Sequence, residues 1–150
     1  MKSAVLSFII SGFIFSNSIL ACDNLMGVEE VTCMEQASLE QTMNAMRRLR
    51  TTLREELAED GSLDEILTTL SDIQNWILMA TRKVPPKISE IENQQDRHRN
   101  YILYKSLLSQ LHAAFVDVEN EANEGRRSDA LNIINTRIRE LQKHGHDLFQ

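Results

Sequence analysis

The chain has 150 residues, 42% apolar and 25% charged, which is enough for one folded domain and too few for two of ordinary size. Its 16 basic and 22 acidic residues give a formal net charge of −6. This balance argues against nucleic-acid binding, because phosphate contacts need clustered basic side chains. The 5 Gly and 2 Pro are too few for an all-β fold with many tight turns, and two cysteines cannot form a four-cysteine zinc site.

Residues 1–21 have the layout of a secretory signal peptide. Lys2 supplies the positive start, an apolar run extends over residues 4–15, and Ala21 is the small residue after which cleavage is expected. The run is too short to span a bilayer securely. A short buried N-terminal helix is the alternative interpretation. Removal of residues 1–21 takes away one basic residue, Lys2, and leaves 129 residues with a net charge of −7.

Residues 22–36 form an expected N-terminal extension that contains both cysteines, Cys22 and Cys33. In an oxidising compartment the pair is expected to close a small disulfide loop, which would stabilise the fold by roughly 2–3 kcal/mol. Alternatively, Ile19-Leu20-Ala21-Cys22 resembles a bacterial lipoprotein box, which would place a lipid on Cys22. The spacing of the two cysteines does not fit a Cys-x-x-Cys redox motif.

Apolar residues recur every three or four positions through residues 37–150, the pattern of helices that bury one face. The four stripes are Leu39, Met43, Met46, Leu49, Leu53 and Leu57; Leu63, Ile66, Leu70, Ile73, Ile77, Ala80 and Val84; Tyr101, Tyr104, Leu108, Leu111, Phe115, Val118 and Ala122; and Leu131, Ile134, Ile138, Leu141, Gly145 and Leu148. No segment alternates with period two, so no β-sheet is expected.

Turn and cap signals separate the four stripes. Gly61 ends the first, and Ser62 with Glu65 three positions later forms a capping box for the second. Pro85-Pro86 ends the second stripe, and the polar residues 87–97 are expected to form a connection or the frayed start of the third helix. The third stripe closes at Glu124-Gly125, and Ser128 is the expected N-cap of the fourth helix. Residues 37–150 are therefore predicted to be all-α, as an antiparallel up-down-up-down four-helix bundle.

The sequence contains no phosphate-binding loop, no nucleophile elbow and no His-Glu-x-x-His pair, so no enzyme activity is expected. Met43 lies near the start of the first helix, and His144 and His146 lie near the end of the fourth. In an antiparallel bundle these ends meet, and a thioether and an imidazole could ligate a haem iron from its two sides. The same residues have ordinary interpretations, because methionine often packs a core and a C-terminal histidine favours the helix dipole.

Four segments resemble the soluble periplasmic cytochrome b-562 family, and together they span residues 37–150. They are Ala37-Ser38-Leu39-Glu40-Gln41-Thr42-Met43, Val84-Pro85-Pro86-Lys87-Ile88, Ala122-Asn123-Glu124-Gly125-Arg126 and His146-Asp147-Leu148-Phe149. Their order and separation match the family, whereas the extension with two cysteines departs from its simple pattern. The resemblance implies a periplasmic electron-transfer protein with one noncovalent b-type haem and an unidentified redox partner protein.

The resemblance implies Met43 as one axial ligand and a C-terminal histidine as the other. Counting back from Phe149 selects His146, whereas counting from Gly125 falls between the two histidines, so His144 stays an alternative. Tyr104 and Leu108 fall where the family places residues that line the haem pocket.

A haem-free helical envelope protein is the rival expectation. Such a protein would act as a binding or chaperone-like module, and it would contact a membrane only through a lipid on Cys22.

Overall fold

The computed structural model describes residue 34 and residues 36–149. The predicted signal peptide and the predicted Cys22–Cys33 bridge lie outside the described residues. Every regular element in the described part of the chain is helical. The elements are α2 (Leu39–Ala58), α3 (Leu63–Thr81), α4 (Pro86–Ser89), α5 (Gln94–Asn123), α6 (Arg127–Ile133), the π-helical turn η2 (Ile134–Ile138) and α7 (Arg139–Phe149).

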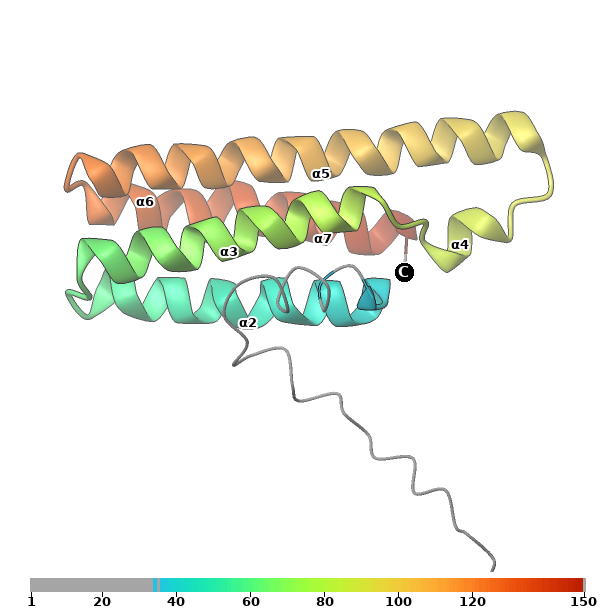
Figure 1. Ribbon diagram of the computed structural model, residues 1–150. Coiled ribbons are helices and arrows are strands. Elements are labelled where there is room, and N and C mark those ends of the chain that lie inside the picture. Colours follow the sequence, from blue (N-terminus) through green and yellow to red (C-terminus); the bar gives the residue numbers. More distant parts are fainter. Residues whose placement is uncertain (1–33, 35, 150) are drawn as a thin grey trace, which may run out of the picture.

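Four long helical rods lie side by side, because α6, η2 and α7 continue one another as a single rod (Figure 1). Helix α2 packs against α3 and α6, helix α3 packs against α5, and α5 packs along the rod from α6 to α7. The predicted all-α class and the predicted four-helix architecture are therefore confirmed.

One apolar cluster fills the space between the four rods, and it is built from the predicted stripes. Residues from the stripes with no exposed surface include Leu53, Leu70, Ile73, Ile77 and Ile138. Burial of each such side chain contributes about 1.5–3 kcal/mol. Two stripe members are wrongly predicted as buried, since Leu63 is 41% and Val84 48% exposed. Leu63 is the first residue of α3 and Val84 lies beyond its last residue, so both stand at the margins of the stripe.

Helices α2 and α3 both begin with a capping box. The Ser62 hydroxyl accepts a hydrogen bond from the Glu65 amide at 3.2 Å, and the Glu65 carboxylate accepts one from the Ser62 amide at 2.9 Å, as predicted. Ser38 and Gln41 form the same arrangement at the start of α2. Such caps pair amide groups that the first helical turn leaves without partners, and each contributes about 1 kcal/mol.

Residues 87–97, predicted as a connection or the start of the third helix, divide between the two: 94–97 belong to α5, and the residues before them form the connection with a short helix, α4. Pro86 is the first residue of the one-turn helix α4, a position where its missing N–H group costs nothing. Helix α5 already begins at Gln94, because the Asn93 side chain accepts hydrogen bonds from the amides of Gln95 and Asp96.

The fourth helix begins near Ser128, as predicted, but Ser128 is not its N-cap. Helix α6 begins at Arg127, and the residue at the N-cap position, Arg126, makes no capping hydrogen bond through its side chain. Gly125 has φ +75°, so the chain turns immediately after α5 and re-enters a helix before Ser128 is reached.

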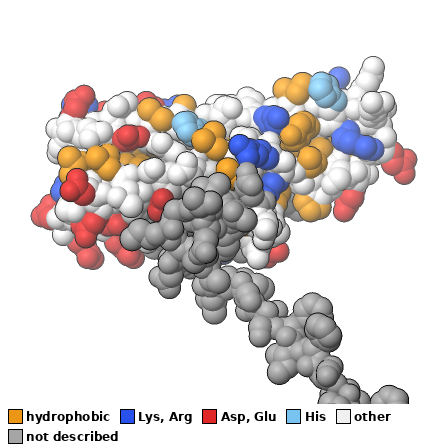
Figure 2. Space-filling view, in the orientation of Figure 1, with side chains coloured by type: hydrophobic (Ala, Val, Ile, Leu, Met, Phe, Trp, Pro, Cys, Tyr) orange, Lys and Arg blue, Asp and Glu red, His pale blue; other side chains and the backbone are white. Residues whose placement is uncertain are grey.

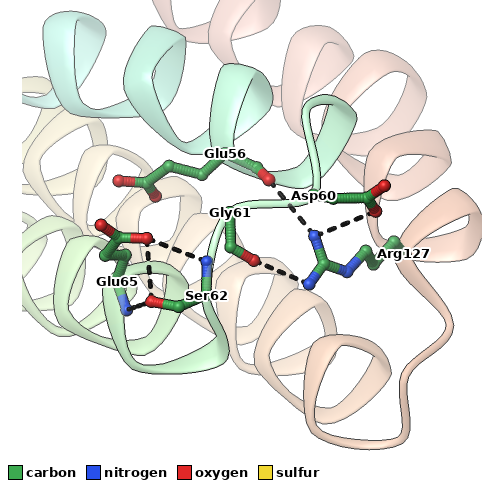
Figure 3. Close-up of polar contacts among 6 residues, drawn as sticks. All are labelled: Glu56, Asp60, Gly61, Ser62, Glu65 and Arg127. Atoms are coloured by element: carbon green, nitrogen blue, oxygen red, sulfur yellow. Dashed lines mark hydrogen bonds and ion pairs between the residues drawn. The ribbon is translucent and has the colours of Figure 1, made fainter.

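The turn between α2 and α3 is held by Arg127 from the start of α6 (Figure 3). Its guanidinium donates hydrogen bonds to the carbonyl oxygens of Gly61 at 2.7 Å and Glu56 at 3.4 Å, and lies 3.6 Å from the Asp60 carboxylate. Gly61 is required here, since a Cβ atom would lie 2.9 Å from the Glu56 carbonyl oxygen. The fourth rod is thus tied to the end of the first rod and to the turn that follows it.

Candidate functional site

Met43 lies on the side of α2 that faces α7. It is half-buried against the core and stands seven residues before Arg50, so the two share one side of the helix. The Arg50 guanidinium donates a hydrogen bond to the side-chain oxygen of Gln142 on α7. The side of α2 that carries Met43 and Arg50 is therefore turned toward α7.

The two candidate histidines of α7 lie on different sides of that helix. His146 follows Gln142 by four residues and precedes the buried Phe149 by three, so it shares the side that reaches α2. His144 follows Arg137 by seven residues, and Arg137 forms an ion pair with Asp117 of α5. Both histidines are exposed, and the geometry favours His146 over His144 as the partner of Met43.

Met43 and His146 also lie at the same end of the bundle. The beginning of α2 and the C-terminal end of α7 lie toward the same end of the bundle in Figure 1. Measured from the Arg50–Gln142 contact, Met43 is seven residues toward that end and His146 is four, which correspond to about 10 Å and about 6 Å along the helices. Both residues are therefore displaced from that contact toward the same end of the bundle, and their thioether and imidazole groups fit the donor set that two ligands of one haem would supply.

Tyr104 and Leu108 are both buried in α5, 3% and 5% exposed. The Tyr104 hydroxyl donates a hydrogen bond to the Ala80 carbonyl oxygen at 2.9 Å, and its ring meets that of Phe149 edge-on with centroids 5.5 Å apart. Burial raises the pKa of Tyr104 far above its ordinary value. Tyr104 thus joins α5 to α3 and α7, and it forms an apolar wall next to the last turn of α7.

In the part of the chain that the structure describes, no three His, Cys, Asp or Glu side chains come together in a way that could hold a metal ion. A methionine–histidine pair is a different kind of site, because two protein ligands suffice where a porphyrin supplies the others. No described helix has the length and apolar character needed to cross a membrane.

Sequence reasoning missed the basic side chains beside Met43. Arg47, Arg50 and Arg54 follow Met43 on the same side of α2, and Arg139 approaches them from α7. The signal was present in the spacing, since positions 43, 47, 50 and 54 recur every three or four residues.

Comparisons of the chain with protein-family models, with curated proteins and with solved structures return no significant match. Membership of the cytochrome b-562 family therefore stays a prediction from the four short segments.

Proposed function

We propose that this protein is a periplasmic electron-transfer protein that holds one noncovalent b-type haem between α2 and α7. Met43 and His146 are the proposed axial ligands. The observation that carries the proposal is the hydrogen bond between Arg50 of α2 and Gln142 of α7, because Met43 and His146 lie on the same sides of these helices as the two bonded residues. Residues 1–21, with the features of a signal peptide, support export from the cytoplasm.

The chain's own residues would bind and shield the cofactor. When bound, the haem iron would supply one-electron chemistry by alternating between its ferric and ferrous forms. Met43 and His146 would hold the haem iron through a thioether and an imidazole, a ligand set that suits electron transfer rather than substrate chemistry. The buried side chains of Met46, Tyr104 and Leu108 would exclude water from the interior side. A low dielectric environment together with a thioether ligand raises the reduction potential.

We further propose that consecutive rods alternate in direction as an up-down-up-down bundle. The connections at residues 59–62 and 124–126 are short, and short connections join antiparallel neighbours. Both short turns lie at the end of the molecule opposite the C-terminus in Figure 1, which agrees with this alternation. The arrangement matters for function because it brings the first turns of α2 to the last turns of α7.

The test is uptake of haemin by the purified chain that begins at Cys22, followed by visible spectra of the oxidised and reduced forms. We expect a six-coordinate, low-spin spectrum in both forms. Met43→Ala and His146→Ala should each convert it to a five-coordinate or high-spin spectrum. Met79→Ala and His144→Ala are matched controls, because Met79 lies on α3 and His144 on the α5 side of α7.

A chain that stays colourless with haemin would refute the proposal and favour the haem-free envelope protein. A low-spin spectrum that is lost in His144→Ala and kept in His146→Ala would show that the wrong histidine has been assigned.

A further inference from the structure

Four arginine side chains lie around the hydrogen bond that joins Arg50 of α2 to Gln142 of α7. Arg47, Arg50 and Arg54 follow one side of α2, and Arg139 lies across from them on α7; we call these four residues the arginine seam. Arg50 is half-buried and hydrogen-bonded to Gln142, whereas the other three are exposed. The seam extends over two turns of α2, or about 10 Å.

None of the seam arginines forms an ion pair with a residue that the structure describes. Other arginines do so, since Arg126 pairs with Glu121 and Arg137 with Asp117. Burial lowers the pKa of Arg50, and the charges of Arg54, Arg47 and Arg139 lower it further. Like charges held together destabilise a fold, and an anion bound between them would relieve this repulsion.

The chemistry of the seam favours carboxylates on another protein. A guanidinium presents planar pairs of donors that match a carboxylate, and the exposed line of three arginines suits an extended surface better than one small ion. A membrane surface is less suited, because interfacial binding combines basic side chains with apolar anchors. The exposed large apolar side chains in the described part of the chain all lie on α3, α5 or the segment after α3; they are Leu63, Leu78, Val84, Ile102 and Leu103.

We propose that the arginine seam is the docking surface for an acidic partner protein, whose surface carboxylates lie between Arg47, Arg54 and Arg139. On the face that Figure 2 shows, acidic side chains gather toward the end of the bundle that carries the α2–α3 turn. Because the seam adjoins Met43 and His146, docking there would bring the partner close to the proposed haem. That consequence for electron transfer rests on the proposed function, whereas the docking surface does not.

The experiment measures binding of a fluorescently labelled oligoglutamate peptide to the chain that begins at Cys22, by anisotropy at low ionic strength. The test variant is Arg47→Gln with Arg54→Gln, which leaves the Arg50–Gln142 contact in place. The control is Lys87→Gln with Arg99→Gln, which removes the same charge from exposed positions on α4 and α5. We expect the test variant to bind the peptide about tenfold more weakly, the control to change affinity less than about twofold, and added salt to abolish the difference.

Separate arms use inorganic phosphate and phosphatidylglycerol vesicles as probes, and every measurement is made with and without prior haemin treatment. Equal losses in test and control variants would refute a localised docking surface. Seam-dependent binding to vesicles without peptide binding would assign the seam to a lipid surface, and displacement of the peptide by phosphate would assign it to a small anion. Loss of peptide binding after haem uptake would show that the arginines serve the carboxylates of the haem.

The two proposals fail separately in these measurements. Peptide binding by a chain that takes up no haem would refute the proposed function and support the docking surface. Haem uptake by a chain that does not bind the peptide would support the proposed function and refute the docking surface.

Discussion

Arg127 joins the first turn of α6 to the turn between α2 and α3, and its replacement by methionine isolates that contact. Methionine keeps most of the aliphatic length and removes the guanidinium. The hydrogen bond to the Gly61 carbonyl oxygen, at 2.7 Å, involves a charged donor and is worth about 1.5–3 kcal/mol. The contact with the Glu56 carbonyl oxygen, at 3.4 Å, is long and adds little.

Two further electrostatic effects determine how much Arg127→Met lowers the free energy of unfolding. The Asp60 carboxylate is 96% exposed, so its ion pair with Arg127 contributes close to nothing. A cation in the first turn of a helix is unfavourable by about 0.3–1 kcal/mol, and the variant gains that amount. The free energy of unfolding should therefore fall by about 1–2 kcal/mol, which lowers Tm by about 3–8 °C for a chain of this size.

Urea and thermal unfolding of the chain that begins at Cys22 measure this loss, with Asp60→Asn as the control. We expect Asp60→Asn to change the free energy of unfolding by less than about 0.5 kcal/mol. If Asp60→Asn costs as much as Arg127→Met, or if Arg127→Met costs nothing, the turn is not held by the carbonyl contacts and the reasoning is wrong.

Two other substitutions test buried polar groups, and both are measured by urea unfolding. Tyr104→Phe removes the hydroxyl but keeps the ring against Phe149. Because the Lys83 amide still donates to the Ala80 carbonyl oxygen at 3.1 Å, the free energy of unfolding should fall by only about 0.5–1.5 kcal/mol. A fall of more than about 3 kcal/mol would contradict this expectation. Burial raises the pKa of Glu56, although its hydrogen bond from Thr69 opposes the shift. The folded chain therefore binds this proton more tightly than the unfolded chain, and the ionised carboxylate destabilises the fold as pH rises through the folded-state pKa. The Glu56→Gln variant, whose side-chain oxygen can still accept a hydrogen bond from Thr69, should be more stable than the parent at pH 7. The difference in the free energy of unfolding should shrink at pH 3. A difference that grows on acidification would show that the pKa of Glu56 is not raised in the folded chain.

The apolar stripes and the cap at Ser62 were predictable because they depend on local chemistry. Burial of one helical face fixes a spacing of three or four residues, and a hydroxyl followed by Glu65 satisfies amides within a single turn. The same local reasoning located the start of the fourth helix but assigned the wrong N-cap, because the chain re-enters a helix directly after Gly125 and before Ser128.

The side on which each histidine lies could not be predicted from spacing. His144 and His146 flank Gly145, and a periodic pattern treats them alike. Only contacts between helices distinguish them, since Gln142 reaches Arg50 on α2 whereas Arg137 reaches Asp117 on α5. The gathering of arginines from α2 and α7 was hidden for the same reason, because it joins positions almost ninety residues apart.

The π-helical turn at Ile134–Ile138 sets which side of α7 faces each neighbouring helix. A turn of this kind holds one residue more than an α-helical turn, so its removal would rotate all of α7 by about 100° about its axis. A one-residue deletion there would leave α2, α3, α5 and α6 with their sequences unchanged, yet it would turn Gln142 and His146 away from α2. Deletion of one residue would therefore keep the four-helix architecture and yet remove the imidazole from the side of α7 that reaches α2.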